Sequence, residues 1–176
     1  RFFLNAFETL DTDRVIIAPE GLSRFYTDAS HQRVGATWMT REDRELEIAD
    51  HIAYLDALYA TIRMETGDVP LHVLGFSQGV ATVARWLVHG GTKSKHVVLW
   101  GGALPPELTS AQLSAAWGGG VVDLVHGTRD QLVPETTFRA NEELLMRSGL
   151  TVRTHLFPGG HALDPVLLAR CMEHAG

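Results

Sequence analysis

One short segment governs the architecture that we expect: Leu71-His72-Val73-Leu74-Gly75-Phe76-Ser77-Gln78-Gly79. Its apolar run breaks into Gly-x-Ser-x-Gly, and the small and apolar residues 80–88 follow. This order predicts a strand, a sharp turn and a helix with Ser77 at the apex, which is the geometry of a nucleophile elbow. The serine backbone is strained at such a turn, so we expect Gly75 and Gly79 to let strand and helix approach each other. An ordinary turn whose serine only caps the helix is the alternative that this segment leaves open.

The rest of the chain alternates between apolar runs and helical patterns. Strands are expected at residues 14–18, 95–100, 121–126 and 151–157, and helices at residues 1–7, 40–62, 110–117, 134–147 and from Asp164 onward. Residues 19–40 read as a long loop, with Thr40 as the N-cap of the helix that follows it. Alternation at this spacing predicts a mostly parallel, doubly wound α/β sheet with helices on both faces. We expect a single domain over residues 1–176.

The composition narrows the class of protein. The chain has 176 residues, is 45% hydrophobic and carries a formal net charge of −6, which argues against a nucleic-acid partner. No apolar run approaches the length of a membrane span. The single cysteine, Cys171, cannot form an internal disulfide and is expected to be a small buried hydrophobe, so we expect a cytoplasmic location.

The groups that would activate Ser77 are expected on loops at the carboxyl ends of other strands. One such loop reads His126-Gly127-Thr128-Arg129-Asp130-Gln131-Leu132-Val133-Pro134, and the next reads Phe157-Pro158-Gly159-Gly160-His161. The order Ser77, Asp130, His161 is the order of nucleophile, acid and base in α/β-hydrolases. We therefore expect Asp130 to orient His161 and His161 to act as the base.

Other residues compete for these roles. His126 precedes the expected acid and is interpreted as a structural histidine. Asp164 has a sufficient role as a helix N-cap, and Asp123 lies inside a strand. No pair of histidines has the helical spacing of metal ligands with a carboxylate, so the sequence predicts no catalytic zinc site.

At these motifs the chain resembles the phospholipase/carboxylesterase family of α/β-hydrolases, which contains carboxylesterases and acyl-protein thioesterases. The resemblance rests on residues 75–79, on Trp100-Gly101-Gly102-Ala103-Leu104-Pro105, on residues 126–134 and on Gly159-Gly160-His161. It implies an α/β-hydrolase fold and a cofactor-free serine esterase that acts on small acyl esters, with Ser77, Asp130 and His161 as the catalytic residues. Thioesters and lysophospholipids are further substrates that it allows.

The family also implies an oxyanion hole with two amide donors. The residue after the nucleophile, Gln78, supplies one of them. The other comes from a His-Gly-rich loop near the start of family members, which we do not find and expect to lie before Arg1. A protein without that loop is expected to lose on the order of 10²–10³ in rate.

The segment Gly35-Ala36-Thr37-Trp38-Met39-Thr40 is a second departure from the family, and we expect it to face the site. Trp38, Met39 and Leu132 are candidates for lining an acyl pocket, although plain core packing explains Trp38 and Met39 equally well. A binding protein or an acyltransferase on the same scaffold remains an alternative to hydrolysis. The acyl length, the leaving group and the oligomeric state are left open.

Overall fold

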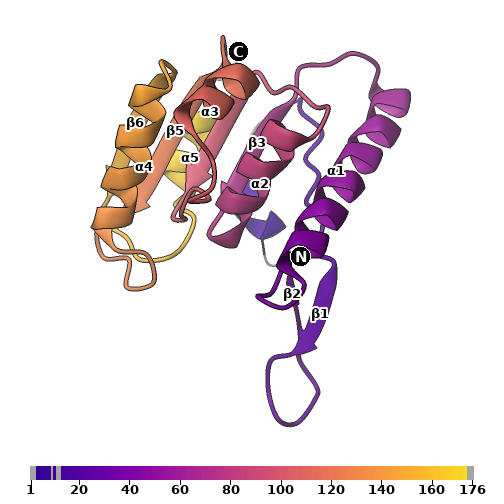
Figure 1. The fold of residues 1–176 in the computed structure, drawn as a ribbon. Coiled ribbons are helices and arrows are strands. Elements are labelled where there is room, and N and C mark those ends of the chain that lie inside the picture. Colours follow the sequence, from indigo (N-terminus) through magenta and orange to yellow (C-terminus); the bar gives the residue numbers. More distant parts are fainter. Residues whose placement is uncertain (1–2, 9, 11–12, 174–176) are drawn as a thin grey trace.

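A four-stranded parallel sheet forms the centre of the protein in the computed structural model, which describes residues 3–8, 10 and 13–173 (Figure 1). The strands lie in the order β3-β4-β5-β6. They are β3 (His72–Phe76), β4 (His96–Trp100), β5 (Val121–Gly127) and β6 (Thr151–Phe157). All three pairings are parallel, as the alternating pattern predicted.

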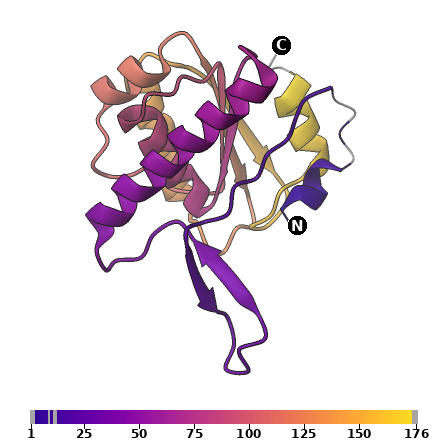
Figure 2. The same ribbon diagram turned by 90° about the vertical axis from the view of Figure 1, so that its right-hand side faces the viewer.

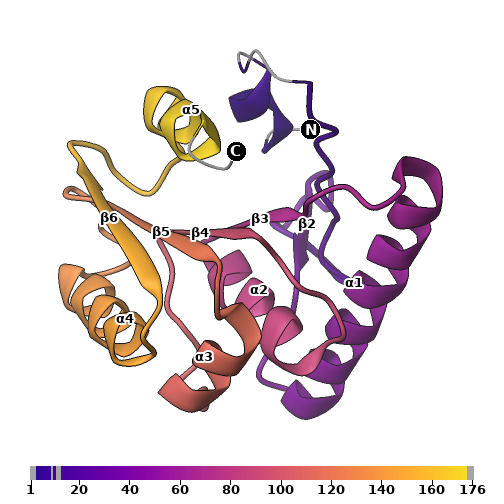
Figure 3. The same cartoon turned by 90° about the horizontal axis from the view of Figure 1, so that it is seen from above.

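Helices cover both faces of this sheet, as Figure 3 shows from above. One face carries α1 (Arg44–Thr66), α2 (Gln78–His89), α3 (Ser110–Trp117) and α4 (Glu135–Arg147). The opposite face carries α5 (Pro165–Glu173) and the short 3₁₀ helix η1 (Leu4–Phe7). The arrangement is an α/β-hydrolase fold, in agreement with the predicted class. No described helix is both long enough and apolar enough to cross a membrane.

The sheet separates two hydrophobic cores because successive side chains of a strand point to opposite faces. In β4, which is buried along its whole length, Val97 and Leu99 belong to the core under α1–α4, whereas Val98 and Trp100 belong to the core under α5. Residues 97–100 of β4 are thus a continuous apolar run rather than an alternating one, as expected for a strand covered on both faces.

Two expectations for the N-terminal part are wrong. Residues 14–18 form no strand, because no described segment pairs with them, and Val15 is 72% exposed. The expected loop at residues 19–40 instead contains an antiparallel hairpin of β1 (Ser23–Tyr26) and β2 (Val34–Thr37), which projects from the body (Figure 2). Its strands pair only with each other and are mostly exposed. The sequence therefore lacks the apolar run that identifies a buried strand at these positions.

The first two predicted helices have different bounds in the structure: the first is shorter than expected, and the second is shifted by four residues. The expected helix at residues 1–7 is only the 3₁₀ turn η1, and residues 1–2 lie outside the described part of the chain. Helix α1 begins at Arg44 rather than near Thr40, with Asp43 as its N-cap residue in a left-handed conformation. The hydroxyl of Thr40 lies 3.1 Å from a carboxylate oxygen of Glu47, so Thr40 contacts the first turn of α1 from outside the helix.

Candidate active site

Ser77 lies at the sharp turn between β3 and α2, in a backbone conformation that few residues adopt. Its φ is +55° and its ψ is −120°, and it is one of three non-glycine residues with positive φ in the described chain. The turn is held by backbone hydrogen bonds from Ser77 N to Trp100 O (2.9 Å) and from Val80 N to Ser77 O (3.0 Å). The Ser77 side chain makes no cap bond to α2, which removes the capping role that the sequence left open. Strain of this kind concentrates at functional sites.

The two glycines of the motif play different roles. A Cβ atom built on Gly75 would lie 2.5 Å from the carbonyl oxygen of Gly79, so strand and helix touch there as expected. A Cβ atom on Gly79 would meet nothing within 4 Å. The expectation that both glycines must be small for steric reasons is therefore correct for Gly75 and wrong for Gly79.

Asp130 and His161 form a hydrogen-bonded pair at the carboxyl ends of β5 and β6. Nδ1 of His161 lies 2.8 Å from Oδ2 of Asp130, whose side chain is 1% exposed. The other carboxylate oxygen, Oδ1, accepts hydrogen bonds from the backbone amides of Leu132 (2.8 Å) and Val133 (3.0 Å). These three contacts fix the direction in which the carboxylate faces the imidazole ring.

These contacts also set the charge of Asp130. Burial alone would raise the pKa of its carboxyl group, but the hydrogen bonds from His161, Val133 and Leu132 outweigh burial and hold the pKa below its ordinary value. The carboxylate is therefore ionised at neutral pH. An ionised carboxylate at Nδ1 fixes the tautomer of His161 and leaves Nε2 as the free base.

The loops that carry this pair are joined to each other and to β4. Backbone amides of Thr128 and Arg129 donate to Phe157 O and Gly159 O, each at 2.9 Å. The indole Nε1 of Trp100 donates to Ala162 O at 3.1 Å, directly after His161. This indole contact could not be predicted from the sequence, because it depends on how the loop after β6 folds back onto β4.

The turn after β4 lies between the serine and the acid–base pair. Gly101 has φ +56°, and a Cβ atom there would lie 3.5 Å from Asp130 Oδ2 and 3.6 Å from His161 Nδ1. A Cβ atom on Gly102 would lie 2.2 Å from Ser77 O. The ring of Phe76, the residue before the serine, lies 4.8 Å from the ring of His161. Ser77, Asp130 and His161 thus surround one short turn, although no hydrogen bond joins Ser77 to His161 among the described residues.

The competing residues lie elsewhere. His126 is 2% exposed and stacks on Phe138 of α4, with ring centroids 5.4 Å apart, as a structural histidine would. Asp164 accepts a hydrogen bond from Leu167 N at 2.8 Å and so caps α5 as predicted. Among the described residues, no hydrogen bond or ion pair joins either side chain to Asp130 or His161.

Gln78 is the first residue of α2, so its backbone N–H lies at the positive end of the helix dipole. No described residue accepts a hydrogen bond from this N–H. Its side chain is bound to the segment that follows the hairpin: Oε1 accepts from Thr37 Oγ1 and Trp38 N, and Nε2 donates to Met39 O, each at 2.9 Å. One residue thus carries a free amide beside Ser77 and anchors the hairpin with its side chain.

Replacing Gln78 with alanine is expected to lower the free energy of unfolding by about 1–2 kcal/mol, because three hydrogen bonds of the hairpin anchor are lost. The measurement is urea denaturation, and the matched control is alanine at the exposed Gln131, which should change the free energy by less than about 0.5 kcal/mol. Equal stabilities of the two variants would show that the anchor does not hold the hairpin.

The three candidate pocket residues, Trp38, Met39 and Leu132, have different surroundings in the structure. Trp38 packs on α1, with its ring 6.4 Å from the rings of both His51 and Tyr54, so its packing favours a core role. Sδ of Met39 lies 3.5 Å from Nη1 of Arg85. Leu132 is 73% exposed, and its backbone amide is the part that contacts Asp130. Of the three, Leu132 has the side chain that is open to solvent next to the acid–base pair.

The α/β fold of this chain is similar to the folds of several solved structures. A protein of unknown function from Agrobacterium tumefaciens superposes with a TM-score of 0.66 at 22% identity, covering 90% of this chain and 76% of that chain. A carboxylesterase from Mesorhizobium loti gives 0.64 at 19% identity, with 79% and 69% covered. A variant of SOBER1 from Arabidopsis thaliana gives 0.62 at 18% identity, with 81% and 76% covered. No curated protein sequence matches the chain.

The fold and the motifs define an α/β-hydrolase. Residues 47–175 match the family model described as phospholipase/carboxylesterase, and this range contains Ser77, Asp130 and His161. The chain belongs to that family, as the resemblance of its motifs indicated.

Proposed function

We propose that the protein is a serine carboxylesterase that cleaves carboxylic esters through an acyl-enzyme on Ser77. The observation that carries the proposal is the 2.8 Å contact between Asp130 Oδ2 and His161 Nδ1, beside a serine whose φ is +55°. A buried carboxylate that orients an imidazole next to a strained serine is the arrangement that activates a hydroxyl for acyl transfer.

Each step uses a group whose position supports its role. Oγ of Ser77 attacks the ester carbonyl while Nε2 of His161 takes its proton, since Nδ1 faces Asp130. The free N–H of Gln78 and the N-terminal end of α2 favour the negative charge on the tetrahedral intermediate. The intermediate expels the alcohol, which receives the proton from His161. Water, deprotonated by the same Nε2, then attacks the acyl group and releases the acid and Ser77.

Covalent labelling tests the nucleophile directly. A fluorophosphonate probe should modify Ser77, and peptide mass spectrometry should place the adduct on the peptide that contains residues 75–79. Nitrophenyl esters of increasing acyl length then define the preferred substrate. Folded protein that is not labelled at Ser77 while His161 is intact would contradict the proposal.

The pH dependence of hydrolysis is expected to show one ionisation on its acid side. Asp130 has a pKa below its ordinary value and stays ionised between about pH 5 and 8, so its carboxylate adds no second ionisation to this limb. We expect kcat/KM to fall by about tenfold per pH unit below the inflection. A limb that is twice as steep would mean that Asp130 also gains a proton in this range.

A further inference from the structure

Asp123 is a charged residue in the middle of the buried strand β5. Its side chain is 1% exposed and faces α5 together with Val125. Both carboxylate oxygens are paired with histidines: Oδ2 lies 2.5 Å from Nε2 of His96, and Oδ1 lies 2.6 Å from Nε2 of His155. These contacts, which outweigh the opposing effect of burial, hold the pKa of Asp123 well below its ordinary value. A carboxylate buried in an apolar core is costly and therefore requires an explanation.

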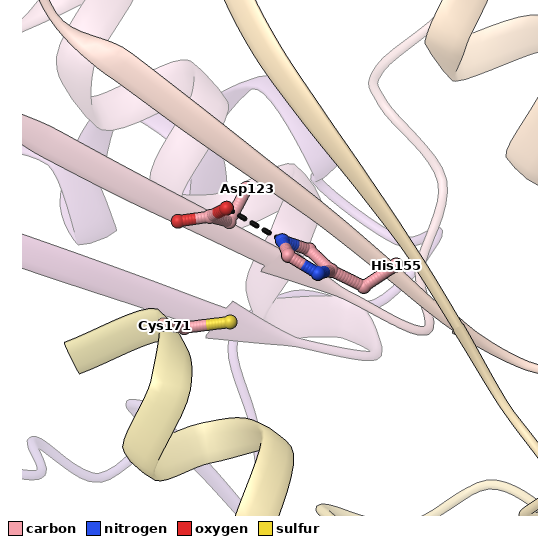
Figure 4. A group of neighbouring side chains, drawn as sticks. All are labelled: Asp123, His155 and Cys171. Atoms are coloured by element: carbon pink, nitrogen blue, oxygen red, sulfur yellow. Dashed lines mark hydrogen bonds and ion pairs between the residues drawn. The ribbon is translucent and has the colours of Figure 1, made fainter. Parts of the chain in front are cut away.

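Cys171 of α5 brings a third type of donor to this carboxylate (Figure 4). Its thiol, an oxygen of Asp123 and a ring nitrogen of His155 all lie within 4.8 Å of one another. Zinc holds such ligands at about 2.0–2.3 Å, so these donors need to move by only about an ångström to share one ion. We propose that Asp123, His155 and Cys171 bind a divalent transition-metal ion such as Zn²⁺, at a site separate from the catalytic residues.

The Cys171 thiol must lose its proton before its sulfur can bind a metal ion as a thiolate. Burial and the negative charge of Asp123, against the positive charge of Arg153, raise the pKa of the Cys171 thiol to about 12. A thiol of this kind stays protonated unless a positive ion replaces the proton. A divalent ion bridges the carboxylate and the thiolate, so binding releases the thiol proton and strengthens as the pH rises.

The surroundings of the three ligands also fit a metal site. His96 holds the second oxygen of Asp123, as outer-shell partners hold metal-ligating carboxylates. The side chain of His155 is 26% exposed, which gives an ion a route from solvent. Asp123 and Cys171 are both 1% exposed, so the other two ligands are shielded from water. The site would join α5 to β5 and β6.

Cobalt binding tests the proposal with a signal that only one residue can give. Cys171 is the sole cysteine of the chain, so a thiolate-to-cobalt charge-transfer band in the near ultraviolet must come from it. We expect the untagged full chain to show this band with one Co²⁺ per chain, to lose it when Zn²⁺ is added, and to bind more tightly at higher pH. The Ser77→Ala variant should give the same band, because the site does not depend on the proposed esterase chemistry.

Two variants separate a metal site from a core that is merely filled by a small side chain. Cys171→Val keeps this position small and apolar and should abolish the band while the metal-free protein remains folded, as its melting curve will show. His155→Gln should weaken cobalt binding by at least about 10–100-fold. His89→Gln, at an exposed histidine outside the group, should leave it unchanged. Folded wild-type protein that shows no thiolate band, or a Cys171→Val variant that binds cobalt as tightly as the wild type, would overturn the proposal.

Discussion

Replacing Ser77 with alanine is expected to lower kcat for ester hydrolysis by roughly 10⁴–10⁶-fold, because the proposed nucleophile is removed. His161→Ala should cause a loss of similar size, since the serine hydroxyl then has no base. The double variant should be scarcely slower than either single variant, because nucleophile and base act as one unit. Steady-state kinetics on a nitrophenyl ester, with full-length protein, measures all three.

A second substitution of Ser77 distinguishes loss of chemistry from loss of fold. Ser77→Gly should be as inactive as Ser77→Ala and yet more stable by about 1 kcal/mol, since glycine adopts a φ of +55° with little strain. Chemical denaturation checks the stability. An inactive Ser77→Gly variant that is less stable than the wild type would show that the turn does not store strain.

The sheet could be predicted from the sequence because its strands have their own signal. Residues such as Val97 to Leu99 are apolar without interruption, and this pattern identifies a strand buried on both faces wherever its neighbours lie. The run at residues 14–18 has the same pattern but no described partner, so composition alone could not show that it is irregular and exposed. Whether a segment pairs as a strand depends on a second segment, so the sequence of the first segment alone does not reveal it.

The candidate site also contains residues that could be predicted from the sequence and residues that could not. Asp130 and His161 could be predicted because the carboxyl ends of parallel strands meet at one edge, and the structure brings the two side chains together there. The side-chain anchor of Gln78 and the group around Asp123 could not be predicted. Their partners come from separate elements, and Cys171 lies 48 residues after Asp123 in the sequence, so no spacing pattern connects them.

Gly75→Ala is expected to lower the free energy of unfolding by about 3 kcal/mol or more. The added Cβ atom would lie 2.5 Å from Gly79 O, 2.7 Å from Gly79 C and 2.9 Å from Val80 Cα. All three atoms belong to the backbone of α2, so no side chain can rotate away and the helix must move off the strand. Because that movement also displaces Ser77, hydrolysis should fall together with stability. Urea denaturation and kcat on the same preparations measure the two effects.

Gly79→Ala is the matched control from the other end of the same motif. Its Cβ atom would meet nothing within 4 Å, and the residue lies in the first turn of α2. Since alanine favours a helix over glycine by about 0.5–1 kcal/mol, this variant should be as stable as the wild type or slightly more stable. A loss at Gly79 as large as that at Gly75 would mean that strand and helix meet differently from the contacts described here. A loss at Gly75 alone locates the packing requirement of the elbow two residues before Ser77.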